Sequence, residues 1–242
     1  MNTPACRTAG PWIMLGSRMA LFLAMQGLIA LVLRAAGTPD AWSESSRWWM
    51  HAVLGANLVS IALLVWLLRQ EGGRLGDLLR FDRRTFWKDL VWSVGGFLLA
   101  GPIASRPMSS LGAVLPGSYD RAIAMLFRPL PMWAILLGFL FPITIAFAEL
   151  PTYFGYVMPR LEKQLRSGWL AWAIASLFLS LQHATLPLIL DGRFVLWRAL
   201  MYLPFAFYIG AIIKLRPRLL PFLVIGHALI DLATVAVYFT LA

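Results

Sequence analysis

The chain has 242 residues, of which 60% are hydrophobic and only 13% charged, and its mean hydropathy is +0.74. This composition excludes an ordinary soluble domain and predicts an integral membrane protein whose main partner is the lipid bilayer. The formal net charge of +10 is concentrated between the apolar stretches, which argues against a nucleic-acid partner. The single cysteine, Cys6, excludes an intramolecular disulfide and a Cys-based metal site.

Stretches with almost no charge predict the transmembrane helices. Each is near or above the ~17–25 residues that a membrane-spanning helix needs. In chain order they are 19–33, 48–68, 90–105, 129–159, 167–190, 199–213 and 219–242. The sequence therefore predicts an all-α, polytopic membrane protein with about seven to eight transmembrane helices and a polar site within the bundle. We expect residues 1–242 to form one transmembrane domain.

Two segments between these spans are less regular. The segment 69–89 carries leucines at helical spacing among several arginines, which predicts either a short helix on the anionic cytoplasmic leaflet or a solvated basic loop. The segment 103–128 contains Pro107, Pro116 and Gly117. It predicts a loop with a short helix near 119–127, or a re-entrant piece.

The basic residues predict the orientation. With a cytoplasmic N-terminus, the inner loops hold fourteen of the 21 basic residues, Arg18 among them, and the outer loops hold seven, Arg198 among them. This is the sense of the positive-inside bias. For seven spans, the N-terminus is then cytoplasmic and the C-terminus lies on the opposite side.

Four ionisable side chains lie inside the apolar stretches: Glu149, His183, His227 and Asp231. A charged residue at the bilayer centre costs roughly 2.5–3.5 kcal/mol on insertion scales, so such residues usually face a partner, a cavity or a substrate. Counting 1.5 Å per residue from the basic end of each helix puts them at roughly 16, 25, 13 and 20 Å from one membrane boundary. We expect them to meet in one layer.

Local spacing supports this expectation. His227 and Asp231 are separated by four residues, so a helix presents both on one face. Pro151 follows Glu149 by two residues and cannot donate a backbone hydrogen bond, which predicts a kink beside Glu149. At membrane depth, the freed carbonyls need protein or water partners, so we expect a polar cavity there.

Three segments of the C-terminal half resemble the motifs of a known family. They are AELPTYFGYVMPRLE (148–162), SLFLSLQHA (176–184) and GHALIDL (226–232). Together they resemble the CPBP family, the CAAX-protease and bacteriocin-processing intramembrane proteases, over a catalytic core at 131–242. The family pattern is Glu-Glu-x-x-x-Arg-Gly, then Phe-x-x-x-His, then His-x-x-x-Asn or Asp.

The chain departs from this pattern in its first motif. Leu150 stands where the second glutamate is expected, and Phe154 where the arginine is expected. A lesser change puts Leu179 where the second motif has phenylalanine. If the glutamate and arginine pair with each other, losing both can be nearly neutral, whereas losing one strands a buried charge. The absence of both the second glutamate and the arginine therefore favours an active site with a different structural support over a decayed site.

The resemblance implies a glutamate-dependent intramembrane endopeptidase that acts on a membrane-associated protein or peptide, by analogy in a bacterial cytoplasmic membrane. It implies that Glu149 is the general base and that His183 helps to hold the attacking water. His227 would donate to the oxyanion, a role worth about 2.7–4 kcal/mol in comparable sites. An ionised Asp231 cannot donate to an oxyanion, so it either stays protonated or orients His227, and its spacing favours orientation. No cofactor and no metal are expected.

Other interpretations remain open. A single intramembrane histidine is often a helix–helix hydrogen bonder. Two histidines with Glu and Asp could also bind Zn²⁺, although no HExxH helix fixes their geometry. A non-catalytic immunity or scaffold protein, or a proton-coupled transporter, would explain the missing motif residues. We expect His51 to be interfacial and Gln26, Asn57 and Gln182 to join helices, with Gln182 a candidate cavity residue.

Overall fold

The computed structural model describes the backbone of residues 4–241 and the side chains of residues 8–241. The side chain of Cys6 lies outside this range. All the regular elements of the described residues are helical, as the apolar sequence predicts, because lipid offers backbone groups no hydrogen-bond partners.

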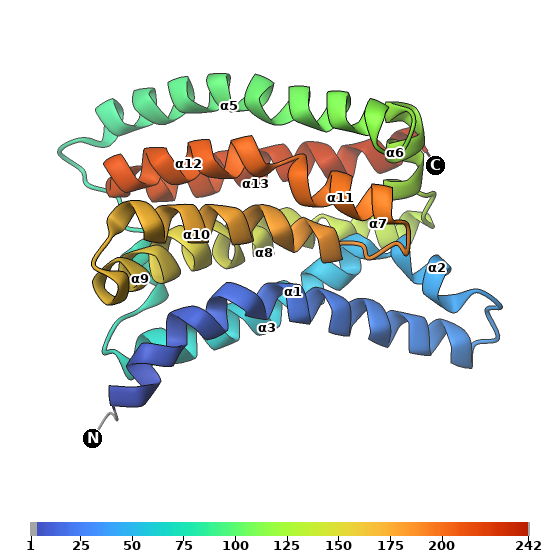
Figure 1. Cartoon of the computed structure of the whole chain (residues 1–242), viewed down its shortest axis with the longest axis horizontal. Helices are drawn as coiled ribbons and strands as arrows, with labels where there is room; N and C mark the ends of the chain where they lie inside the picture. The colour runs from blue at the N-terminus through green and yellow to red at the C-terminus, as the bar shows by residue number, and fades with distance from the viewer. Residues whose placement is uncertain (1–3, 242) are drawn as a thin grey trace.

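Figure 1 shows the elements, which run largely side by side along one axis. In chain order they are α1 (Pro4–Ala35), α2 (Ala41–Ser46), α3 (Trp49–Gln70), α4 (Leu75–Leu78), α5 (Phe86–Val114), α6 (Tyr119–Leu126), α7 (Met132–Gly138), α8 (Leu140–Ala148), the π-helical turn η1 (Pro151–Val157), α9 (Met158–Leu165), α10 (Gly168–Leu181), the 3₁₀ turn η2 (Gln182–Thr185), α11 (Gly192–Leu200), α12 (Leu203–Leu215), η3 (Pro217–Leu219), α13 (Leu220–Val237) and η4 (Tyr238–Thr240).

Five helical segments of the described chain are long and apolar enough to cross a membrane. They are Thr8–Ala35, Ala41–Gln70, Met132–Leu165, Gly192–Leu215 and Pro217–Thr240. The chain is thus an integral membrane protein, but the expected seven to eight spans are not confirmed. The two remaining long elements are α5, which contains Pro102 and Pro107, and α10, whose regular helix has only 14 residues.

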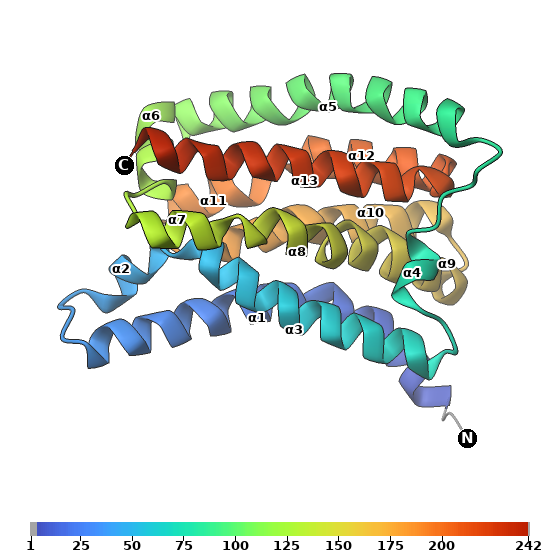
Figure 2. The ribbon, with the colours of Figure 1, turned by 180° about the vertical axis from the view of Figure 1, so that it is seen from behind.

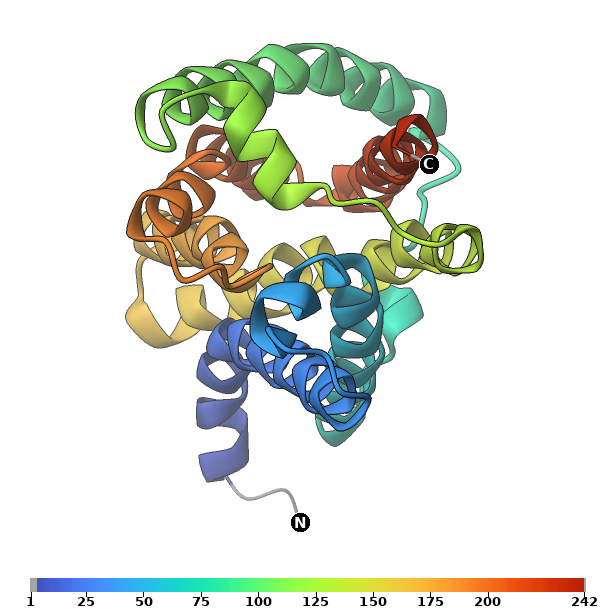
Figure 3. The same cartoon turned by 90° about the vertical axis from the view of Figure 1, so that its right-hand side faces the viewer.

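The helices form a bundle with α5 on one side and the α1–α3 pair on the other (Figures 1 and 3). Between them, α3 packs against α8, α10 packs against α12, and α13 packs against both α8 and α5. Large apolar side chains cover the outside; Leu98 of α5, for example, is 73% exposed. Such a surface suits lipid as the surrounding solvent.

The two ends of the bundle differ in their loops. The N-terminus and the loops after α3, α9 and α12 lie at one end, and the C-terminus and the loops after α1, α5 and η2 lie at the other (Figure 2). The loops at the N-terminal end hold most of the arginines and lysines that the sequence analysis assigned to the cytoplasmic side.

The segment 103–128 is more helical than predicted. The short helix near 119–127 is confirmed as α6, but the loop predicted from residue 103 is wrong, because α5 continues past Pro107 to Val114. Each proline removes one backbone hydrogen bond, whereas ending the helix in an apolar surrounding would expose several unpaired groups. Gly117, with a positive φ of 96°, turns the chain into α6.

Between the end of α3 at Gln70 and the start of α5 at Phe86, the segment 69–89 contains the single-turn helix α4. Its leucines, Leu75, Leu78 and Leu79, pack against the core of the bundle, and Phe81 contacts Phe222 of α13 with ring centroids 4.8 Å apart. The short helix is thus present, and its leucines face the end of the bundle, so the segment is not simply a solvated loop; its contact with the leaflet stays a prediction.

Candidate active site

Glu149 lies at a break in the long Met132–Leu165 segment. The regular helix α8 ends at Ala148, and the π-helical turn η1 begins at Pro151. Proline lacks the backbone N–H and clashes with the preceding turn, so the helix widens at this point. The predicted loosening of the backbone beside Glu149 is confirmed, and the Glu149 side chain points into the bundle with only 4% exposure.

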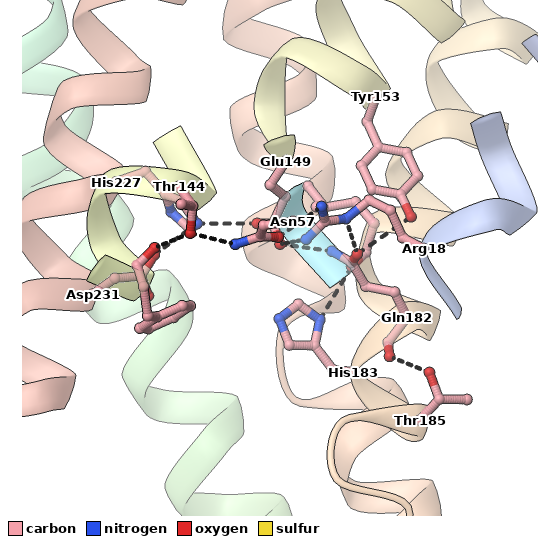
Figure 4. A network of polar contacts seen from close by, with 12 residues as sticks. Arg18, Asn57, Thr144, Glu149, Tyr153, Gln182, His183, Thr185, His227 and Asp231 are labelled. Atoms are coloured by element: carbon pink, nitrogen blue, oxygen red, sulfur yellow. Dashed lines mark hydrogen bonds and ion pairs between the residues drawn. The ribbon is translucent and has the colours of Figure 1, made fainter. Parts of the chain in front are cut away.

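His227 and Asp231 come from α13, one turn apart, and His227 lies between Asp231 and Glu149 (Figure 4). The Nε2 atom of His227 lies 3.0 Å from Oε1 of Glu149 and 3.4 Å from Oδ2 of Asp231. One ring nitrogen thus bridges two carboxylates. The predicted proximity of the three residues is confirmed, with Asp231 on the same nitrogen as Glu149 and not on the opposite one.

His183 lies in η2, where the end of α10 tightens into a 3₁₀ turn. Its Nδ1 is 3.1 Å from the carbonyl oxygen of Leu179 and 3.2 Å from that of Ser180. Carbonyl oxygens only accept, so Nδ1 must carry the proton. In the neutral ring, Nε2 then keeps a free lone pair. The ring packs edge-on against Tyr202, with centroids 4.7 Å apart.

Arg18 and Gln182 contact the other oxygen of Glu149. The Gln182 amide donates to Oε2 at 2.8 Å, and Nη2 of Arg18 lies 3.6 Å from the same atom. Arg18 also donates through Nε to Gln182 at 2.8 Å and through Nη1 to Asn57 at 3.0 Å. The prediction that Arg18 belongs to an inner loop is wrong, because α1 begins well before it and the side chain is 0% exposed.

Arg198 is the second basic residue that the sequence analysis misplaced. It lies in α11, is 3% exposed, and donates to the backbone carbonyls of His183 and Leu186. The chain is irregular between η2 and α11, so buried carbonyls there need a donor from elsewhere. Arg198 supplies that donor, which explains its burial.

All four predicted site residues line one cavity of about 600 Å³. The rest of its wall is mostly apolar and comes chiefly from α5, α6, α8, α12 and α13, with single residues from α3, α10 and α11. Gly101 and Ser105 of α5 and Ile230 and Ala233 of α13 line the cavity and are exposed to a water-sized molecule. The wall that α5 and α13 contribute is therefore accessible.

A second side of the cavity reaches the end of the bundle at α6. Tyr119 and Asp120 line the cavity there and are exposed. Burial raises the pKa of the Tyr119 phenol, and the charge of Asp120 raises it further. This end carries the C-terminus (Figure 2).

The two residues that depart from the resembled first motif, Leu150 and Phe154, belong to the core. Leu150 and Phe154 are both buried, and the Phe154 ring lies where Gly210 of α12 leaves room for it. Within the described residues, no group of three or more His, Cys, Asp or Glu side chains has an arrangement that could hold a metal ion. His51, expected at the interface, faces the Ala134 carbonyl at 3.0 Å and the Trp48 ring.

Comparisons with family models, with curated proteins and with solved structures find no match to this chain.

Proposed function

We propose that the chain is a glutamate-dependent intramembrane endopeptidase of the kind that the CPBP resemblance implies. One observation carries the proposal: helices from separate parts of the chain bring Glu149, His183, His227 and Asp231 to the wall of a single cavity inside an apolar bundle. Ionisable residues at membrane depth usually serve a substrate or a proton path, and convergent polar groups in an apolar pocket are the usual form of a catalytic site.

The proposed reaction begins when a substrate carbonyl reaches His227. In the resting site, His227 Nε2 is paired with Glu149 Oε1 at 3.0 Å. When the substrate's carbonyl oxygen takes over this N–H, Oε1 becomes free to accept a proton. A water molecule then attacks the carbonyl carbon while its proton passes to Glu149, and the oxyanion forms at His227. The proton finally passes to the leaving amine nitrogen as the C–N bond breaks.

The two remaining residues assist in this scheme. The free Nε2 lone pair of His183 accepts a hydrogen bond from the attacking water, because its Nδ1 is committed to the backbone. Asp231, 3.4 Å from His227, balances the charge of the imidazole and limits its rotation.

The shape of the cavity supports a membrane-associated peptide as substrate. Its lining is largely apolar, and the exposed wall residues of α5 and α13 support an entrance between these two helices, on the lipid side of the bundle. An extended apolar segment can thus reach Glu149 from the bilayer without leaving it.

We also propose seven spans, with the N-terminus in the cytoplasm of a bacterial cell. In this topology α5 and α10 with η2 cross the membrane together with the five apolar segments. The support is that both elements run alongside those segments (Figures 1 and 2), and that the basic loops gather at the N-terminal end.

The test is cleavage by the purified protein in lipid vesicles, using membrane peptides from cells that carry the wild type or the Glu149→Gln variant. We expect fragments that only the wild type produces. Glu162→Gln is the matched control, because Glu162 pairs with Lys214 away from the cavity. Equal cleavage by wild type and Glu149→Gln would refute the proposed base. Cleavage that survives chelators would refute a metal mechanism, whereas loss that Zn²⁺ reverses would support it.

One observation favours a second candidate, a non-catalytic membrane scaffold. Both oxygens of Glu149 are already paired in the resting site, with His227 on one side and Gln182 and Arg18 on the other. A fully paired buried carboxylate also suits a purely structural network. A cellular phenotype of gene deletion that Glu149→Gln restores as fully as the wild type would favour this candidate.

A further inference from the structure

The buried guanidinium of Arg18 is directed at the proposed base from the N-terminal helix. Two of its nitrogens are used: Nε donates to Gln182 and Nη1 donates to Asn57. The third, Nη2, lies 3.6 Å from Oε2 of Glu149 and has no hydrogen-bond partner among the described residues. The fork of the guanidinium therefore spans the carboxylate and the amide that holds it (Figure 4).

Arg18 also fixes the orientation of the Gln182 amide. A guanidinium can only donate, so the oxygen end of the amide must face Arg18 and the NH₂ end must face Glu149. The distances agree, at 2.8 Å for both contacts, and the Tyr153 hydroxyl lies 3.4 Å from the same amide oxygen. Loss of Arg18 would remove the positive charge beside Glu149. It would also remove the donor that keeps the NH₂ end of the Gln182 amide directed at Glu149.

Arg18 also contributes a positive charge to a cluster that contains two carboxylates. Glu149 and Asp231 are two carboxylates that share one nitrogen of His227. Arginine stays protonated in proteins, so Arg18 is a permanent cation at the base. The arginine position of the first motif is occupied by the buried Phe154, which brings no charge.

We propose that Arg18 is the positioning residue of Glu149. With Gln182 it holds Oε2 and balances the carboxylate charge, which leaves Oε1 for His227 and the cavity. α1 thus supplies the cation that the first motif lacks, from outside the 131–242 core. The positioning role rests on the proposed function, whereas the pairing of Arg18 with Glu149 does not.

The pairing is tested by thermal unfolding in detergent, without any assay of activity. Removing one partner of a buried ion pair leaves an uncompensated charge, so Arg18→Met should lower Tm by about 6–20 °C. The double variant Arg18→Met with Glu149→Gln should recover most of this loss, because both charges are gone. Losses in Tm that simply add in the double variant would overturn the pairing.

The positioning role is tested by cleavage kinetics in vesicles. We expect Arg18→Gln to lower kcat by about 100-fold with little change in KM, because the substrate cavity is intact while the base is misplaced. Arg18→Lys should recover part of kcat, since it keeps the charge but not the fork. Arg34→Gln, an exposed arginine of the same helix, is the control and should match the wild type.

The two experiments separate two kinds of failure. If Arg18→Gln cleaves as fast as the wild type, the positioning role is wrong even where the pairing holds. If the wild type cleaves nothing, the proposed function fails while the unfolding experiment still decides the pairing. A kcat for Arg18→Lys no higher than that for Arg18→Gln would also contradict the role of the charge.

Discussion

At the residue scale, the segment that resembles the first motif has one polar residue at the cavity and two apolar residues where the resembled pattern has glutamate and arginine. Glu149 faces the cavity, while Leu150 and Phe154 belong to the core. The ring of Phe154 fits beside Gly210 because that position has no side chain; a Cβ there would lie 2.7 Å from Cε1 of the ring. Apolar packing between η1 and α12 thus occupies the position where the family pattern has an arginine.

This packing predicts the effect of Gly210→Ala. Overpacking a tight core costs about 1–3 kcal/mol, against a gain of up to about 1 kcal/mol in helix propensity. We expect the free energy of unfolding in detergent to fall by about 1–2 kcal/mol. Gly27→Ala in α1 is the matched control, with no atom within 4 Å of its Cβ, and should raise stability slightly. A stabilised Gly210→Ala variant would show that η1 is loosely packed.

Part of the site could be predicted from single residues. The meeting of His227, Asp231 and Glu149 follows from helical spacing and from depth in the membrane, both of which are local properties of the sequence. The contact with Arg18 could not be predicted, because it depends on how α1 packs against η1 and η2. A signal was present: apolar residues precede Arg18 as well as follow it, which indicates the middle of a helix and not its end.

At the element scale, the π-helical turn η1 sets the direction of Glu149. The turn widens the helix just after Glu149 and rotates the side chains that follow it about the helix axis, relative to a regular α-helix. A one-residue change of phase in a helix turns a side chain by about 100°. Pro151 is the local cause, since its missing N–H prevents the regular pattern.

Restoring that N–H gives a second prediction. Pro151→Ala should let a regular helix continue through Glu149, which would keep or raise thermal stability but lower cleavage by about 100-fold through misplacement of the base. Pro142→Ala is the control, because Pro142 lies in the first turn of α8, where proline does not disturb the hydrogen bonding. Full activity in Pro151→Ala would show that the wide turn does not orient the base.

The helix α5 shows where the sequence was misleading about elements. Pro107, Pro116 and Gly117 suggested a loop, but in an apolar surrounding the helix continues through Pro102 and Pro107 to Val114. Conversely, 167–190 is uniformly apolar and was expected to form one span, yet its regular helix ends at Leu181 and the chain tightens around His183. Hydropathy identifies membrane segments but does not indicate where the regular helix ends within them.

The small residues of α5 give a third prediction. Gly101 lines the cavity at the proposed entrance and has no atom within 4 Å of its Cβ, so Gly101→Trp should fill this entrance without disturbing the fold. We expect KM for a membrane-inserted peptide to rise at least about tenfold. Gly95→Trp on the same helix, equally free of neighbours but outside the cavity lining, should leave KM unchanged. Equal kinetics for both variants would contradict a sideways path for the substrate.

At the scale of the whole molecule, the bundle has one basic end, which carries the N-terminus, and one end with the C-terminus and α6 (Figure 2). With seven crossings, the N-terminus and the C-terminus of the chain would lie on opposite sides of the membrane. If α5 did not cross, the segment after it would lie on the same side as the basic loop before it.

A labelling experiment decides this. In a Cys6→Ser background, single cysteines are introduced by Ala36→Cys, Arg83→Cys and Ser110→Cys, all at exposed positions. With seven spans and a cytoplasmic N-terminus, a membrane-impermeant thiol reagent should label the Ala36→Cys and Ser110→Cys variants in intact cells. The Arg83→Cys variant should react only after permeabilisation. If the Ser110→Cys variant also reacts only after permeabilisation, α5 does not cross the membrane.

The contact of Arg18 with Gln182 and Glu149 also bears on how the protein is made. The two ends of the Arg18–Gln182 hydrogen bond are 164 residues apart in the chain. During synthesis, α1 leaves the ribosome long before either partner exists, and an unpaired guanidinium costs roughly 2.5–3.5 kcal/mol at the membrane centre. The contacts of Arg18 with Glu149 and Gln182 can therefore form only after η1 and η2 have been made. The buried network at α1 is thus completed by residues from the other half of the chain.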